Sequence, residues 1–360
     1  MMEIQDIIRL FHKETPLRSR LREIRLGQHD SRWTLQVDFP KASYMIKLAA
    51  NGFTTEARVS RWNDIINAYR QMGYYSPALL PSMYGRFAEK VVFRSKQCIV
   101  WEEEFSAFPL RETLDQSVYT GADGRYVYHD EVFAFLGKVA EKRFSFFPYP
   151  SGWARFVPFE ADATTDEVME CVQTLDALVR TRAPQFLTRW EQILLLFHEN
   201  RKKLEAIYGR LPTSVFQADT IGNNLLLDAT GHFKGVIDYN LAGEDTALNM
   251  FLSMILFGYS YHRKRIHAPG LLNGLNRETQ GSIERIVLET LSYLRGFYRF
   301  SPLEAKAAPL LYQYISSIEY AEISAFKQHA DDTAKLSLLF DFMESQLSNH
   351  SIPFEDAMLG

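Results

Sequence analysis

The spacing of apolar residues changes about a third of the way along this 360-residue chain, and that change limits the folds it can adopt. Over 33–39, apolar and polar residues alternate, which is the period-two pattern of a half-buried strand. Further strands are expected at 44–48, 91–93 and 98–101, with one helix over 55–72. The front of the chain is therefore predicted to form a small α+β unit that ends near residue 105.

Beyond residue 105 the pattern is mostly helical. Helices are expected near 129–142, 165–179 and 186–208, and the last 100 residues again have helical spacing. Short β-like runs interrupt these helices between 215 and 240. The sequence thus predicts two structural units, 1–105 and 106–360, of which the second is larger and mainly helical.

Charge, hydropathy and cysteine content exclude several classes of protein. The formal net charge is −4, whereas a nucleic-acid-binding protein is expected to be strongly basic. The most apolar run, 247–261, contains Asn249 and is shorter than the ~20 residues that cross a membrane, so it is predicted to be a buried core helix. Cys98 and Cys171 are too few for a disulfide framework, and the first 20 residues do not resemble a secretory signal. We expect a cytoplasmic protein that binds neither nucleic acid nor membrane.

Three polar side chains in the interrupted segment have the composition of a phosphoryl-transfer site. Asp219 lies in a short loop, Asn224 follows five positions later before an apolar strand, and Asp238 ends the next strand, Gly235–Asp238. An Asp before a Gly-Asn pair is by itself typical of a turn. A hairpin, however, would bring all three to one rim, where one carboxylate orients a hydroxyl and the other two groups bind Mg²⁺. The combination favours a catalytic interpretation.

The sequence Asp219-x4-Asn224 followed by Ile237-Asp238-Tyr239 resembles the catalytic core of the aminoglycoside phosphotransferase and choline kinase-like family. That family has the bilobal protein-kinase-like fold. The resemblance implies that Asp219 is the catalytic residue, that Asn224 and Asp238 are metal ligands, and that the cofactors are ATP or GTP and Mg²⁺. The family's loop begins His-Gly-Asp, whereas this chain has Gln217-Ala218-Asp219, so the geometry of the loop is in question.

The resemblance extends to the front unit. Lys47, in the strand Tyr44–Lys47, matches the lysine that contacts the α- and β-phosphates of ATP. The family pairs this lysine with an acidic residue of the following helix, for which Glu56 is the first choice and Asp64 the second. The segment Trp101, Glu102 and Glu103 resembles the hinge that binds adenine through backbone hydrogen bonds, which places the hinge near 101–105.

The resemblance predicts a phosphotransferase that moves a γ-phosphate to a hydroxyl of a small molecule. An inactive nucleotide-binding module of the same fold is the alternative, which the Gln217-Ala218 departure favours. A protein kinase fits less well, because Gly27 is the single glycine where such enzymes have a glycine-rich loop. The acceptor stays open among aminoglycosides, choline-like amines and amino alcohols. Aromatic residues over 144–159 are interpreted as packing between the units, with a substrate pocket as the alternative.

Overall fold

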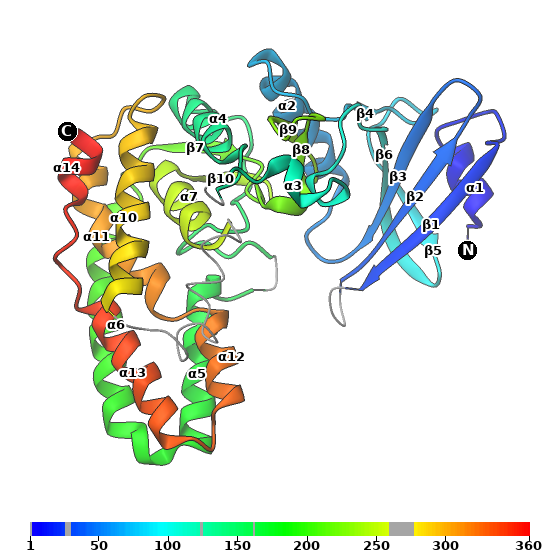
Figure 1. Ribbon diagram of the computed structural model, residues 1–360. Coiled ribbons are helices and arrows are strands. Elements are labelled where there is room, and N and C mark those ends of the chain that lie inside the picture. Colours follow the sequence, from blue (N-terminus) through cyan, green and yellow to red (C-terminus); the bar gives the residue numbers. More distant parts are fainter. Residues whose placement is uncertain (1, 26–29, 123–124, 161–162, 259–276) are drawn as a thin grey trace.

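A computed structural model describes residues 2–360 except 26–29, 123–124, 161–162 and 259–276. A β-rich N-lobe lies beside a larger helical C-lobe (Figure 1). The described strands are β1 (Arg18–Arg25), β2 (Ser31–Asp38), β3 (Ser43–Ala50), β4 (Leu79–Leu80), β5 (Glu89–Phe93), β6 (Lys96–Glu104), β7 (Thr213–Phe216), β8 (Leu225–Leu227), β9 (Phe233–Val236) and β10 (Gly243–Thr246). The described helices are α1 (Ile4–Arg9), α2 (Glu56–Gln71), α3 (Gln116–Tyr119), α4 (His129–Lys142), α5 (Glu167–Arg182), α6 (Leu187–Tyr208), α7 (Ala247–Ser253), α10 (Arg277–Leu294), α11 (Pro302–Ser317), α12 (Tyr320–Gln328), α13 (Thr333–Leu347) and α14 (Phe354–Leu359).

The N-lobe is an antiparallel sheet with the strand order β1-β2-β3-β6-β4, and β5 also pairs with β6. Its two faces differ because side chains alternate along each strand. Trp33, Leu35 and Val37 are buried on one face and form a core with Ile7 and Ile8 of α1. The polar positions between them lie on the other face, toward α2 and the C-lobe. The strand pattern expected from the sequence is confirmed.

Helix α2 connects the two lobes. Thr55 caps its N-terminus by accepting a hydrogen bond from the backbone N–H of Arg58 at 3.2 Å, and the expected helix over 55–72 is confirmed. One guanidinium nitrogen of Arg58 donates to the carbonyls of Pro150 and Ala242, at 3.3 and 3.1 Å. Because both acceptors belong to the C-lobe, α2 is fixed to that lobe near its first turn.

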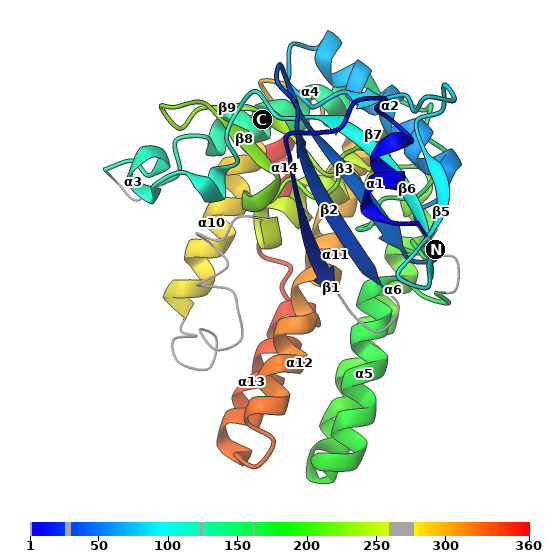
Figure 2. The same cartoon turned by 90° about the vertical axis from the view of Figure 1, so that its right-hand side faces the viewer.

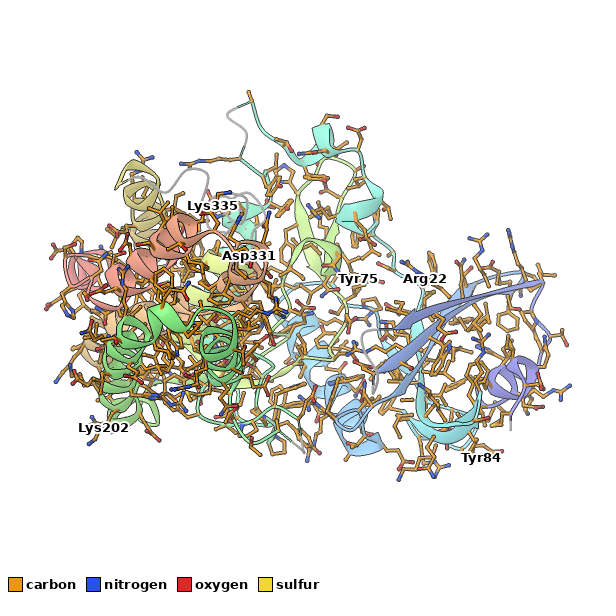
Figure 3. The ribbon with its side chains drawn as sticks, turned by 90° about the horizontal axis from the view of Figure 1, so that it is seen from below. Arg22, Tyr75, Tyr84, Lys202, Asp331 and Lys335 are labelled. Carbon is orange, nitrogen blue, oxygen red and sulfur yellow. The ribbon has the colours of Figure 1, made fainter. Side chains whose placement is uncertain are left out.

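The chain after α2 forms a second joint, at Tyr75, which Figure 3 labels at the junction of the lobes. The backbone N–H of Tyr75 donates to the carbonyl of Lys234 at 2.8 Å, and its carbonyl accepts from Val236 at 3.1 Å. Gly235 lies between these two partners, and a Cβ there would be 1.6 Å from the Tyr75 carbonyl oxygen. The close approach therefore requires glycine. The Tyr75 hydroxyl also accepts the backbone N–H of Ala107 at 3.0 Å.

The C-lobe is built around α6, which packs against α11 and α13, while α5 packs against α12. Helices α5, α12 and α13 extend away from the rest of the molecule (Figures 1 and 2). The apolar run predicted as a core helix over 247–261 forms α7 and a π-helical turn, Met254–Gly258, whose described residues are largely buried; 259–261 lie outside the described residues. No helix in the described part of the chain is both long and apolar enough to cross a bilayer.

Candidate active site

The loop after β7 carries Asp219, the predicted catalytic residue. The residue before it, Ala218, has an unusual backbone conformation. Ala218 is fully buried and has a φ of 66°, in the left-handed region that favours glycine. Asp238, the last residue of the predicted set, has a φ of 62°. These two positions turn the chain sharply where the polar side chains are presented. The family that this loop resembles has glycine at the position of Ala218. The left-handed backbone gives a conformational reason for that glycine, and this chain adopts the same conformation with the smallest chiral side chain.

Gln217 holds the loop together from inside the protein. Its side chain is 1% exposed. Oε1 accepts the backbone N–H of Asp219 at 2.9 Å, while Nε2 donates to the carbonyl of Ile237 at 2.8 Å and to that of Asp238. The amide therefore links the two segments that carry the predicted carboxylates. The sequence had cast doubt on the loop because glutamine replaces the family's histidine, but this side chain makes the bridging contacts itself.

Helix α2 supports the same loop from the N-lobe side. The Tyr69 hydroxyl accepts the backbone N–H of Gln217 at 2.9 Å and donates to the carbonyl of Val215 at 3.3 Å. Burial raises the pKa of Tyr69 well above its usual value, so the hydroxyl stays neutral and keeps both bonds. The loop is thus positioned from both lobes.

Asp219 and Asn224 are in direct contact. Nδ2 of Asn224 donates to the backbone carbonyl of Asp219 at 2.9 Å and to its Oδ2 at 2.7 Å. These bonds fix the amide so that Oδ1 is turned away from Asp219, and no hydrogen bond to Oδ1 forms within the described residues. The carbonyl of Asn224 also accepts the backbone N–H of Ile237 at 3.0 Å, which brings the start of β8 to the end of β9. The hairpin expected from the sequence is confirmed.

The side-chain oxygens of this rim that accept no hydrogen bond from the described groups suit a hard cation. Oδ1 of Asp238 accepts the backbone N–H of Asn240 at 3.2 Å and its side-chain amide, and no bond to Oδ2 forms among the described groups. The Oδ1 of Asn240 is buried and has no hydrogen-bond partner among the residues that the structure describes. The described part of the chain holds no cluster of three His, Cys, Asp or Glu side chains. The described residues of this rim could therefore offer two or three oxygen ligands, a number that fits Mg²⁺ when phosphates complete its shell.

Lys47 faces this rim from β3, but its partner is not the one expected. Nζ lies 2.9 Å from Oε2 of Glu103 in β6. Burial alone would lower the pKa of Lys47, yet the charges of Glu103 and Asp238 raise it, so the amine stays protonated. Asp238 is therefore near enough for its charge to act on the lysine.

The pairing of Lys47 with Glu56 is wrong. Glu56 begins α2 beyond the end of β3, and its carboxylate is 2.8 Å from Nζ of Lys90 in β5. Asp64, the second choice, pairs with Arg61 on the same helix at 3.2 Å. The partner comes instead from the neighbouring strand. Lys47 lies directly opposite Trp101 in the pairing of β3 with β6, which makes Glu103 its diagonal neighbour on the same face of the sheet.

The predicted hinge, Trp101 to Glu103, lies within the sheet. Glu102 and Glu103 pair with β3 on one side and with β4 on the other, so their backbone is not available to adenine. The Trp101 ring packs against Trp62, with centroids 5.3 Å apart, and its N–H donates to Glu103 at 2.9 Å. The Glu102 carboxylate points to the opposite face, 2.6 Å from His12. The chain leaves the sheet only after Phe105, whose backbone N–H still donates to the carbonyl of Ser43 at 3.3 Å.

A cavity of about 280 Å³ opens between the lobes. The N-lobe contributes Asp30, Arg32 and Phe53, and the C-lobe contributes Leu241, three residues after Asp238. Glu167 and Glu170 of α5 line the far wall. Burial is the main cause that raises the pKa of both carboxyls, and for Glu170 the neighbouring Glu167 adds to it.

Aromatic residues of the 144–159 segment occupy two kinds of environment, and their role in a substrate pocket stays a prediction. Phe147 is fully buried in the C-lobe core. Trp153 and Phe159 line the cavity.

Comparison with known proteins gives the fold. No family model matches the chain, and no curated protein matches it. A solved structure of a microcompartment-associated aminopropanol kinase superposes with a TM-score of 0.53 at 14% identity, over 99% of this chain and 98% of that chain. An amicoumacin kinase in complex with AMP-PNP, Ca²⁺ and Ami gives 0.51 at 12% identity, over 99% and 97%. The chain has the fold of a small-molecule kinase. The bilobal α+β kinase-like architecture expected from the sequence is confirmed.

Proposed function

We propose that this protein transfers the γ-phosphate of ATP to a hydroxyl group of a small, cationic amino alcohol. The observation that carries the proposal is the Gln217 amide, which ties the Asp219 loop to the Asp238 segment opposite Lys47. Phosphoryl transfer depends mainly on positioning and on neutralising charge, and this arrangement provides both. The likeness to two small-molecule kinases supports the same conclusion.

Each residue has a defined task in this proposal. Asp219 orients the acceptor hydroxyl and takes its proton, with Asn224 holding the carboxylate in place. Asn224 Oδ1 and Asp238 are the groups that would hold Mg²⁺, which supplies charge neutralisation of the phosphates. Lys47, kept protonated and oriented by Glu103, contacts the α- and β-phosphates.

The nucleotide base is proposed to bind where the chain leaves the sheet. Residues Phe105 to Phe108 follow Glu104, the last paired residue of β6. We propose that the boundary between the nucleotide-binding lobe, 1–105, and the substrate-binding lobe, 106–360, lies there. ATP is preferred to GTP as donor because AMP-PNP occupies the amicoumacin kinase. A cytoplasmic location suits an ATP-dependent enzyme whose two cysteines, Cys98 and Cys171, are both free and buried.

The cavity between the lobes indicates the acceptor. At about 280 Å³ it is at the small end of ligand pockets, so an amino alcohol fits better than an oligosaccharide such as an aminoglycoside. Glu167 and Glu170 provide negative charge for an ammonium group, and Trp153 and Phe159 provide aromatic surface. The aminopropanol kinase among the similar structures agrees with this choice.

Activity is tested by following ADP release from purified protein with Mg²⁺ and either ATP or GTP. The acceptor panel contains 1-amino-2-propanol, ethanolamine, choline, an aminoglycoside and an uncharged diol. We expect turnover with an amino alcohol and much less with the diol or the aminoglycoside. Binding of ATP without transfer to any acceptor would favour the inactive nucleotide-binding module instead.

A further inference from the structure

The γ-phosphoryl group needs positive charge at the point where it passes from nucleotide to acceptor. Negative charge spreads over its equatorial oxygens in the transition state, and fixed cationic donors lower the barrier. Lys47, on the nucleotide side of the rim, is engaged by Glu103 at 2.9 Å. The glycine-rich loop of protein kinases is absent from this sequence. A second cationic side chain on the acceptor side could therefore stabilise the γ-phosphoryl group.

Arg32 occupies that side. In the pairing of β2 with β3, Thr34 is opposite Lys47 and Arg32 is opposite Ala49. Arg32 and Lys47 are thus diagonal neighbours on one face of the sheet, a relationship that brings long side chains within reach of each other. The charge of Arg32 lowers the pKa of Lys47, which agrees with their proximity.

The guanidinium of Arg32 is held in a fixed orientation. Nε donates to both carboxylate oxygens of Asp30 at 3.1 Å, and Nη2 donates to Oδ2 at 2.7 Å. Asp30 is itself held by Asn51, whose Nδ2 donates to Oδ1 at 3.0 Å, and Cζ of Arg32 lies 5.6 Å from the centre of the Phe53 ring. Nη1 makes no hydrogen bond with the described residues. A pre-oriented donor of this kind needs no rearrangement when charge develops.

The same side chain forms part of the wall of the inter-lobe cavity. It is 18% exposed, and the cavity that it lines reaches Leu241, just beyond Asp238. Arg32 therefore lies between the nucleotide side, marked by Lys47, and the acidic acceptor wall, marked by Glu170.

We infer that Arg32 binds the transferring γ-phosphoryl group and stabilises its charge in the transition state, an inference that rests on the proposed kinase function. In this step the bond between the γ-phosphorus and the β,γ-bridging oxygen breaks while the acceptor oxygen bonds to phosphorus. The hydroxyl proton passes to Asp219, and ADP leaves with the bridging oxygen. Arg32 stays protonated and forms no covalent bond.

The test compares Arg32→Gln and Arg32→Lys with wild-type protein. Kinetics are measured with Mg-ATP and 1-amino-2-propanol, or the best acceptor of the panel, and Mg-ADP affinity is measured separately. We expect Arg32→Gln to lower kcat by about 100-fold or more, with Mg-ADP affinity within about twofold of wild type. Arg32→Lys keeps the charge but not the two-pronged contact with Asp30, so its kcat should fall by about tenfold or more. Arg9→Gln removes an exposed arginine paired with Asp6 on α1 and should change neither value.

Thermal unfolding shows whether each variant is folded. If Arg32→Gln does not fold, the inference is tested with Arg32→Lys alone. A kcat within about threefold of wild type in Arg32→Gln overturns the inference while the proposed function stands. So does a loss confined to the KM of the acceptor, or an equal loss in Mg-ADP affinity, because Arg32 would then bind the acceptor or the other phosphates. Failure of wild-type protein to transfer phosphate to any acceptor contradicts both the proposed function and this inference.

Discussion

Gln217 and Asp238 are joined by a hydrogen bond from the side-chain amide of the first to the backbone carbonyl of the second. The same glutamine accepts the backbone N–H of Asp219 at 2.9 Å. One buried side chain thus fixes the spacing of the two segments that carry the carboxylates of the candidate site. The sequence departs at this position from the family that its loop resembles, and the contacts of Gln217 explain how the departure is accommodated.

Replacing Gln217 by leucine should lower both activity and stability. Each buried polar group left without a partner costs about 1–3 kcal/mol of the free energy of unfolding, and the loop would lose its link to Asp238. We expect kcat to fall by at least about tenfold, since small displacements of reacting groups are costly. Urea unfolding and steady-state kinetics measure the two effects. Gln217→His keeps one donor and one acceptor, so it should retain more activity than the leucine variant; equal activity in all three proteins would contradict the bridging role.

The partner of Lys47 is tested by two matched variants. Glu103→Gln removes the charge that orients the lysine, so nucleotide affinity or kcat should fall by about tenfold or more. Glu56→Gln removes a pair with Lys90, whose side chain is 73% exposed, and should leave kinetics within about twofold, since exposed ion pairs contribute little. Steady-state kinetics with varied ATP concentration are measured for both variants, and they separate an effect on the KM of ATP from an effect on kcat. A larger effect from Glu56→Gln would restore the partner expected from the sequence.

The left-handed backbone at Ala218 predicts that a valine substitution lowers stability much more than a glycine substitution does. Ala218→Val places a β-branched residue at a φ of 66° in a fully buried site, and should lower the free energy of unfolding by about 2 kcal/mol or more. Ala218→Gly relieves strain but loses a buried methyl, two effects of similar size, so stability should change by less than about 1 kcal/mol. Denaturant unfolding checks both. Equal stability of the two variants would contradict the strain.

Acceptor binding should depend on pH through the acidic wall of the cavity. Burial, together with the charge of Glu167, raises the pKa of Glu170, so the folded protein keeps this group protonated to a higher pH than the unfolded chain does. A neutral carboxyl does not attract an ammonium group, and the KM of the acceptor should therefore fall as pH rises through the raised pKa. The folded protein binds the proton of Glu170 more tightly than the unfolded chain does. The free energy of unfolding should therefore decrease as pH rises through the same range. Glu170→Gln should raise the KM at high pH by about fivefold and flatten its pH dependence.

The control for that experiment is Glu199→Gln, an exposed residue of α6 away from the cavity. It should leave the pH profile of the KM unchanged. A profile that stays the same in Glu170→Gln would exclude Glu170 as the group that titrates, and with it the acidic wall as the site of the ammonium group.

The parts of the site that could be predicted from the sequence are those made by local structure. Asp219, Asn224 and Asp238 are brought together by a short hairpin, in which Leu225 pairs with Val236, and short-range pairing leaves a pattern in the sequence. Strands β2, β3, β5 and β6 and helix α2 were predictable for the same reason, whereas β1 was not predicted. Alternation of apolar residues reports directly which face of a strand is buried.

The parts that the sequence did not reveal depend on pairing between distant strands. Lys47 meets Glu103 only because β3 pairs with β6 in a particular register, and a shift of one residue would have turned Glu103 to the other face. The same pairing buries the backbone that was expected to be the hinge. The role of Gln217 depends on the carbonyls of Ile237 and Asp238, which no side-chain pattern indicates.

The most direct measurement compares phosphate transfer and nucleotide binding in wild-type protein and in Asp219→Asn. The substitution removes the group that takes the proton but keeps the shape of the side chain and its contact with Asn224. We predict that transfer from Mg-ATP to the amino alcohol falls by about 100-fold or more, while the affinity for Mg-ATP stays within about threefold of wild type. Transfer at the wild-type rate by Asp219→Asn would contradict the central claim that this loop carries the catalytic group.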